Sequence, residues 1–292
     1  MSCVDEHAYE PLNKHGNEHN NEHGNEHGNE PATSTAMSTP LSTPTNPPMK
    51  APIVLVHGAW GGAWIWRRVL GPLRAAGHEV HAVTLTGDGE RAHLRQRSIT
   101  LQTHIADVMA LVQAEELGPG GVLLVGHSYG GMVVTGAADS LLNGNPAAVC
   151  GIVYVDAIVP LPGEGWGHTH SAQVVAARTA AALANDHALP PPDPRDFGIE
   201  GADRDWLLRR QVPHPFGPYR EPLPFDGARW AALPRTFIDC NQPAYASIDT
   251  MRQRVRALPG FKVVEIKTGH CPMVTEPQAL VQQLLAAADR LR

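Results

Sequence analysis

Residues 122–134 read VLLVGHSYGGMVV, in which a glycine-rich turn separates two apolar runs. The first run predicts a buried strand, and the second has the composition to begin a helix. The turn, residues 126–130, has the form GxSxG, which between a strand and a helix is typical of a nucleophile elbow. Such a turn holds the serine in a strained backbone conformation, and its glycines avoid collisions there. Ser128 is therefore the candidate nucleophile.

A serine hydroxyl is a weak nucleophile at neutral pH and needs a neighbouring base. His270 is the candidate, because it follows the last predicted strand and precedes the last predicted helix. In proteins with this elbow, the triad runs serine, acid, histidine along the chain. That order excludes three histidines that precede Ser128, namely His57, His104 and His127.

From Ala51 onward, short apolar runs alternate with longer segments of helical period. Runs that are apolar throughout indicate strands buried on both faces, as in a parallel sheet between helices. The predicted strands lie near Pro52–Val56, Glu79–Leu85, Gly121–Val125, Gly151–Val155, Arg235–Asp239 and Lys262–Ile266. The predicted helices are Trp64–Ala76, Leu101–Leu117, Gly131–Leu142, Ile248–Leu258 and Pro277–Leu291.

Two segments depart from this α/β pattern. Residues 1–50 contain seven acidic residues against two lysines, with repeated Asn-Glu-His followed by a Ser/Thr/Pro run, and such a composition predicts a disordered tail. Residues 160–230 are rich in proline, glycine and aromatic residues, which predicts a cap inserted into the α/β domain of residues 51–292. The fold class is therefore α/β, a mainly parallel sheet of about six strands with an inserted cap.

Composition also excludes several classes of protein. The net charge is −6 and no basic stripe is present, so nucleic acid is not an expected partner. Four cysteines without a repeated spacing indicate neither a disulfide framework nor a zinc site and favour a cytoplasmic location. No apolar run reaches the roughly 18 residues needed to span a membrane. Neither a metal nor an organic cofactor is expected, and monomer and homodimer both stay open.

Three stretches carry a resemblance to a known family: residues 57–60 (HGAW), 126–131 (GHSYGG) and 269–273 (GHCPM). They resemble the α/β-hydrolase branch of plant methylesterases, hydroxynitrile lyases and related bacterial carboxylesterases, over about residues 51 to 292. This resemblance implies a sheet that begins at the strand before His57. It also implies an oxyanion hole formed by the backbone N–H groups of Ala59 and Tyr129.

The third triad member is less clear from the sequence. Plant members of the branch carry an aspartate after the strand that corresponds to Arg235–Asp239, but residues 240–243 read CNQP and offer no carboxylate. Asp156 closes the strand Gly151–Val155, at the edge where catalytic loops gather in open α/β sheets. Asp239 lies at the end of its own strand. Asp156 suits the geometry of a triad acid better, and Asp239 stays the alternative.

Together these residues predict a serine-dependent carboxylesterase that acts on a small to medium apolar ester. The first alternative is a hydroxynitrile lyase, or an amide- or lactone-cleaving enzyme, with the same triad. Lyases of this branch carry threonine before the oxyanion residue and lysine after the catalytic histidine, whereas this chain has Gly58 and Cys271. The second alternative is a non-catalytic small-molecule receptor on the same fold, which the intact Ser128 and His270 disfavour.

Overall fold

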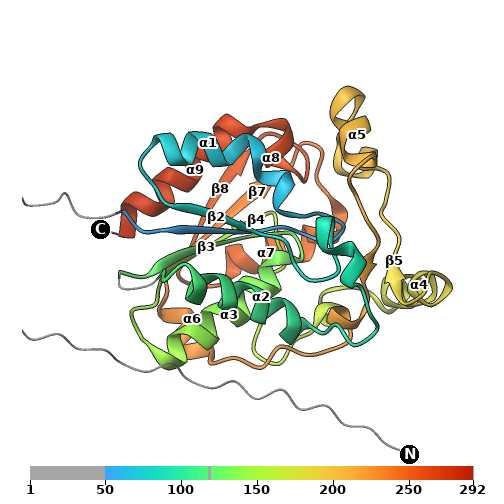
Figure 1. Ribbon diagram of the computed structural model, residues 1–292, viewed down its shortest axis with the longest axis horizontal. Helices are drawn as coiled ribbons and strands as arrows, with labels where there is room; N and C mark the ends of the chain where they lie inside the picture. Colours follow the sequence, from blue (N-terminus) through green and yellow to red (C-terminus); the bar gives the residue numbers. More distant parts are fainter. Residues whose placement is uncertain (1–49, 118–119, 292) are drawn as a thin grey trace, which may run out of the picture. The chain divides into compact units, whose positions relative to one another are not determined.

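Six parallel strands form the centre of the part of the chain that the computed structural model describes, residues 50–117 and 120–291 (Figure 1). The neighbouring strands are parallel throughout, as predicted. Residues 1–49 of the predicted tail lie outside the described residues. The strands in spatial order are β2 (Val80–Val83), β1 (Ile53–Val56), β3 (Val122–His127), β4 (Val149–Val155), β7 (Arg235–Cys240) and β8 (Phe261–Ile266).

The burial of the strands follows their place in the sheet. Every residue of the inner strands β1, β3 and β7 is buried. The edge strands β2 and β8 are only partly buried. Strands covered on both faces need apolar side chains throughout, which explains the uninterrupted apolar runs.

Helices cover both faces of the sheet. Figure 1 shows α1 (Arg67–Ala75) and α9 (Pro277–Ala288) on one face, and α2 (Leu101–Ala114) and α3 (Gly130–Gly144) on the other. The predicted helices are all present. The predicted helix after β7 is α7 (Asp249–Ala257), and a short helix that the sequence pattern did not predict, α8 (Pro272–Thr275), follows β8. Short 3₁₀ turns complete this part of the chain: η1 (Ala63–Trp66), η2 (Gly89–Leu94), η6 (Ala246–Ile248) and η7 (Asp289–Leu291).

Strand β2 is shorter than predicted because, after Val83, hydrogen bonds that involve side chains take the place of pairing with a neighbouring strand. The Leu85 N–H donates to His57 Nε2 over 3.0 Å. The hydroxyl of Thr84 accepts the backbone N–H of Ala63 at 2.8 Å. The chain therefore leaves the sheet at Val83 and turns across the loop that follows β1.

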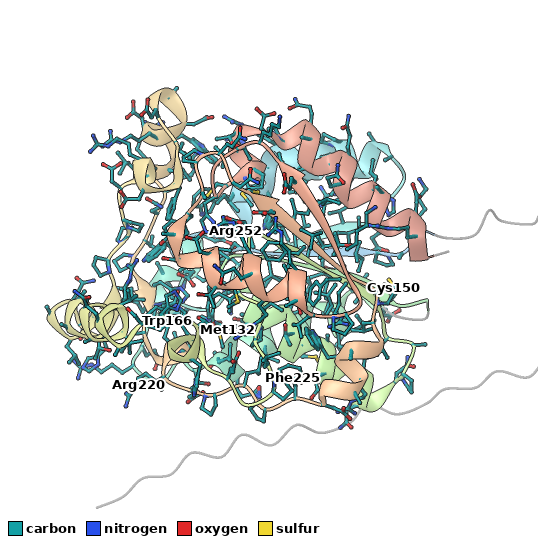
Figure 2. All side chains as sticks on the ribbon, turned by 180° about the vertical axis from the view of Figure 1, so that it is seen from behind. Met132, Cys150, Trp166, Arg220, Phe225 and Arg252 are labelled. Carbon is teal, nitrogen blue, oxygen red and sulfur yellow. The ribbon has the colours of Figure 1, made fainter. Side chains whose placement is uncertain are left out.

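A long segment, residues 160–234, connects β4 to β7, and we call it the connecting segment. It contains three helices and a two-stranded antiparallel sheet that the sequence pattern did not predict. Figure 1 shows α4 and α5 to one side of the six-stranded sheet, and Figure 2 shows Trp166 on that same side from behind. Its elements are η3 (Trp166–Thr169), α4 (Ala172–Ala184), β5 (Ala188–Leu189), η4 (Pro194–Phe197), α5 (Gly201–Leu208), β6 (His214–Pro215), η5 (Gly217–Tyr219) and α6 (Gly227–Ala232).

Within the described ranges, no helix is both long and apolar enough to cross a membrane.

Candidate active site

Ser128 occupies a strained turn between β3 and α3. Its φ is 52°, in the left-handed region that residues with a side chain rarely adopt. A Cβ atom at Gly126 would lie 2.6 Å from the carbonyl oxygen of Gly130, and one at Gly130 would lie 2.7 Å from that of His57. Glycine at both positions is therefore a steric requirement of this turn, which presents the serine at the end of β3.

His270 lies next to Ser128 although 142 residues separate them in the chain. Its Nε2 is 3.0 Å from Ser128 Oγ. The backbone of His270 is held from two sides: its N–H donates to the carbonyl of Phe197 (3.1 Å), and its carbonyl accepts from His127 Nε2 (2.9 Å). The imidazole is thus fixed by contacts with the elbow and with the connecting segment.

The second imidazole nitrogen of His270 lies beside one of the two aspartates between which the sequence did not decide. His270 Nδ1 lies 2.7 Å from Asp156 Oδ2, and both side chains are buried. Asp156 follows β4 directly, with a φ of 42° that turns the chain away from the sheet. Asp239 instead accepts from Arg252 (2.7 Å) and Arg256 (2.5 Å). The structure therefore brings Asp156, and not Asp239, to the histidine.

Arg252 on α7 is a part of the site that the sequence reasoning missed. Its guanidinium donates to Asp156 Oδ1 (2.8 Å), Asp239 Oδ1 (2.7 Å) and Asp249 Oδ1 (2.7 Å). Figure 2 shows it inside the molecule. Because Arg252 takes Oδ1 of Asp156, Oδ2 stays directed at His270. The only signal in the sequence was that two carboxylates close neighbouring strands and need a buried cation.

Burial controls the charge of the histidine and aspartate. Burial lowers the pKa of His270, and the nearby charge of Arg252 lowers it further, so the imidazole is neutral at pH 7 and can accept a proton. Burial raises the pKa of Asp156, and the guanidinium of Arg252 opposes that rise. Arg252 therefore lowers the proton affinity of both members of the pair.

Replacing Arg252 with methionine is expected to destabilise the protein and to change its pH dependence. Removing one partner of a buried ion pair costs about 3 to 5 kcal/mol of unfolding free energy, because the remaining carboxylates stay buried. Without the guanidinium the pKa values of Asp156 and His270 both rise, so the acid limb of kcat/KM moves to higher pH. Urea unfolding and a pH profile of ester hydrolysis measure the two effects.

Arg256→Met is the matched control, since Arg256 binds Asp239, Glu265 and the carbonyl of Arg252 but, among the described residues, makes no hydrogen bond or ion pair with Asp156. We expect its acid limb to stay at the wild-type position. An acid limb that moves equally in both variants would show that Arg252 has no specific effect on the histidine pair.

Two backbone N–H groups lie beside Ser128 without an internal acceptor. Within residues 50–117 and 120–291, neither the N–H of Ala59 nor that of Tyr129 donates to a protein atom. Since His57 Nε2 accepts from Leu85 N–H, its Nδ1 carries the proton and donates to the carbonyl of Gly58 at 2.6 Å. This bond orients the peptide between Gly58 and Ala59, whose N–H is the free donor.

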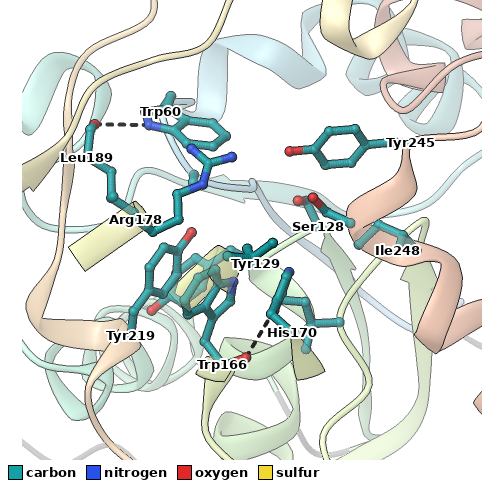
Figure 3. A pocket seen from close by; sticks show the side chains of 14 residues that line it. Trp60, Ser128, Tyr129, Trp166, His170, Arg178, Leu189, Tyr219, Tyr245 and Ile248 are labelled. Carbon is teal, nitrogen blue, oxygen red and sulfur yellow. Dashed lines mark hydrogen bonds between the residues drawn. The ribbon is translucent and has the colours of Figure 1, made fainter. Parts of the chain in front are cut away.

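Ser128 faces two hollows. The first has Trp60, Trp166, Tyr219 and Tyr245 in its walls (Figure 3). The second is lined by His270 and by apolar side chains, among them those of Trp64, Ile65, Phe197 and Leu207. An ester has one substituent on each side of its carbonyl group, and the two hollows offer a place for each.

Two histidines outside the group of Ser128, His270 and Asp156 have structural partners. His104 bonds to the Tyr129 hydroxyl (2.9 Å) and to the carbonyl of Thr86 (2.9 Å). His168 Nδ1 accepts the Gly165 N–H over 2.9 Å. Among the described residues, no group of three histidine, cysteine, aspartate or glutamate side chains is placed to hold a metal ion.

Comparison with known proteins identifies the family. The family model described as "Alpha/beta hydrolase family" matches residues 53–283, and the chain belongs to that family. It is 39% identical over 242 residues to the carbendazim hydrolyzing esterase of Nocardioides sp., an alignment that covers 80% of this chain and 98% of the relative. It is 28% identical to methylesterase 7 of Arabidopsis thaliana, covering 81% and 96% of the two chains.

Solved structures show the same fold. An extracellular alpha/beta-hydrolase from a Paenibacillus species superposes with a TM-score of 0.69 at 22% identity, covering 81% of this chain and 98% of that one. The pyrethroid hydrolase PytH superposes with a TM-score of 0.63 at 23% identity, covering 82% and 97%. The predicted fold is confirmed by these matches, and the predicted class, a carboxylic ester hydrolase, is confirmed by the esterase relatives.

Proposed function

We propose that the chain hydrolyses carboxylic esters through an acyl-enzyme formed on Ser128. One observation carries this proposal: Ser128 Oγ, His270 and Asp156 form a hydrogen-bonded chain of 3.0 and 2.7 Å beside the two hollows. In this proposal Ser128 is the nucleophile, His270 the general base and Asp156 the group that orients the imidazole.

In the first half of the reaction, Ser128 Oγ attacks the ester carbonyl while its proton passes to His270 Nε2. The tetrahedral intermediate collapses as His270 returns that proton to the leaving alcohol, which leaves an acyl group on Ser128. In the second half, a water molecule gives a proton to His270 and attacks the acyl carbonyl. The acid product leaves when the serine is reprotonated.

The charge that develops on the carbonyl oxygen needs donors that are already in place. The free N–H groups of Ala59 and Tyr129 are the proposed oxyanion hole, and α3 begins directly after Tyr129, so its positive end also favours an anion there. The bond from His57 to the Gly58 carbonyl supports this role, because it holds the peptide that supplies one donor.

The division of the chain is also a proposal. We assign the hydrolase domain to residues 51–292, with residues 1–50 as an appended tail and residues 160–230 as a cap over the site. Support comes from the family match, which begins at residue 53, and from the residues of the connecting segment that line the first hollow. A cytoplasmic location stays a prediction from cysteine usage.

Covalent labelling tests this mechanism. We expect phenylmethanesulfonyl fluoride to add one sulfonyl group to Ser128, because this hydroxyl lines the first hollow and lies 3.0 Å from Nε2 of a neutral imidazole. Peptide mass spectrometry locates the label, and p-nitrophenyl acetate hydrolysis should fall in proportion to labelling. Label on another residue, or full hydrolysis by the labelled protein, would contradict the acyl-enzyme.

A further inference from the structure

Arg178 on α4 extends into the first hollow, the one that Ser128 also lines. Its guanidinium carbon lies 5.5 Å from the centre of the Trp60 ring. Figure 3 shows the guanidinium beside that ring, reaching into the space that Tyr219, Tyr245 and Ser128 surround. A charged group therefore lies inside a pocket whose other walls are mostly aromatic and aliphatic side chains.

This guanidinium has no anionic partner among the residues that the structure describes. Within the described ranges, 50–117 and 120–291, no nitrogen of the Arg178 side chain makes a hydrogen bond or an ion pair, and no aspartate or glutamate lines the hollow. The arginines of α7 differ, since Arg252, Arg254 and Arg256 each bind a carboxylate. A partly buried cation without a partner favours a ligand that brings the negative charge.

The walls around Arg178 are flat and fixed. The Trp166 ring stacks on Tyr219, with centroids 4.8 Å apart and planes inclined by 14°, and on His170 at 4.3 Å and 28°. The indole N–H of Trp60 donates to the carbonyl of Leu189 at 3.0 Å, which orients that ring. Flat walls of this kind suit a planar aromatic group.

Polar groups near the Arg178 guanidinium also favour a negatively charged ligand. The hydroxyls of Tyr219 and Tyr245 have no hydrogen-bond partner within the described ranges, so both can donate to a ligand. The charge of Arg178 also shifts the pKa values of neighbouring groups. Burial raises the pKa of Tyr219 and the guanidinium opposes that rise, whereas burial lowers the pKa of His170 and the guanidinium lowers it further.

We infer that the first hollow binds an ester whose planar aromatic body carries a carboxylate, and that Arg178 pairs with that carboxylate. The inference rests on the proposed esterase mechanism and names a substrate class for it, an anionic aromatic ester in place of the apolar ester that the sequence predicts. The carboxylate belongs to the part of the ester that occupies this hollow, which is the acyl part or the alcohol part. In either case Arg178 is the residue that determines specificity for the anion.

Two matched pairs of substrates test the inference. Monomethyl terephthalate and methyl benzoate differ by a carboxylate on the acyl side, and 4-acetoxybenzoate and phenyl acetate differ by one on the alcohol side. For at least one pair we expect Arg178→Gln to reduce the ratio of kcat/KM for the anionic ester to that for the neutral ester by about 10- to 100-fold. The loss should lie mainly in KM, because binding of a remote carboxylate stabilises the ground state and the transition state alike.

Two further variants make the test specific. Arg178→Lys should recover part of the ratio, because an ammonium keeps the charge but not the paired geometry of a guanidinium. Arg209→Gln removes the same charge from an exposed position at the end of α5, outside the hollow, and should leave the ratio at the wild-type value.

The outcomes separate this inference from the proposed function. An unchanged ratio in both pairs, or a wild-type protein that hydrolyses neither anionic ester while it hydrolyses the neutral ones, would overturn the role of Arg178 and leave the esterase mechanism intact. A protein that hydrolyses none of the four esters and takes no sulfonyl label would contradict the proposed function itself.

Discussion

Ser128→Ala is expected to reduce kcat for p-nitrophenyl acetate by about a million-fold, because the variant has no nucleophile that can form an acyl-enzyme. The fold should persist, since within the described residues the hydroxyl makes one hydrogen bond, with His270 Nε2, and the strained turn depends on Gly126 and Gly130. Initial rates at high protein concentration measure the loss, and circular dichroism with a thermal melt confirms folding.

A double variant makes this prediction sharper. If Ser128 and His270 act as a unit, Ser128→Ala/His270→Ala should be about as slow as Ser128→Ala alone, because a base without its nucleophile contributes little. Ser140→Ala on α3, the helix that follows the Ser128 turn, removes a hydroxyl that donates to the carbonyl of Gly136, and this variant should keep the wild-type rate. A Ser128→Ala protein that retains even a few per cent of the wild-type kcat would rule out the serine mechanism.

Asp156→Asn is expected to reduce kcat by about ten-thousand-fold. Asparagine has nearly the same shape, but it cannot stabilise the imidazolium that forms on His270, and it can hold the imidazole in the wrong tautomer. It also leaves Arg252 with one carboxylate fewer in a buried position. Rates measured at several pH values separate this loss from a simple displacement of the pH optimum.

Asp239→Asn is the matched control for the acid. Asp239 is as deeply buried as Asp156 and binds the same Arg252, but its partners are arginines and not the histidine. We expect this variant to unfold at a lower temperature and to lose at most about ten-fold in kcat, through a less firmly held Arg252. A larger loss in Asp239→Asn than in Asp156→Asn would reverse the assignment of the two carboxylates.

Local sequence was sufficient to predict the sheet, the elbow and the histidine. The strands are apolar throughout because both faces are covered, and the turn at Ser128 needs glycines at fixed positions. These features are set by residues close together in the chain. His270 could be predicted because it follows the last strand, as the chain order serine, acid, histidine of such triads requires.

The contacts of Arg252 and Arg178 could not be predicted, because they depend on tertiary packing. Arg252 lies 96 residues from Asp156, and its helix reads DTMRQRVRA, in which three arginines could equally face solvent. Arg178 lies on an alanine-rich helix of the connecting segment, where periodicity does not indicate which face covers the site. Only the fold places the Arg252 guanidinium against three aspartates and the Arg178 guanidinium in the first hollow.

The hydrogen bond from the His270 N–H to the Phe197 carbonyl joins the proposed general base to a segment that lines the second hollow. Phe197 ends η4, in a loop-rich segment, and such segments vary most easily when an enzyme adapts to new substrates, whereas His270 must keep hydrogen-bonding distance to Ser128 Oγ, 3.0 Å in this structure. Insertions or deletions near residues 194–198 would therefore change the reaction rate together with the choice of substrate. Changes of sequence, natural or engineered, are accordingly better tolerated around α4, which makes no backbone hydrogen bond to residues 267–271, the loop that carries His270.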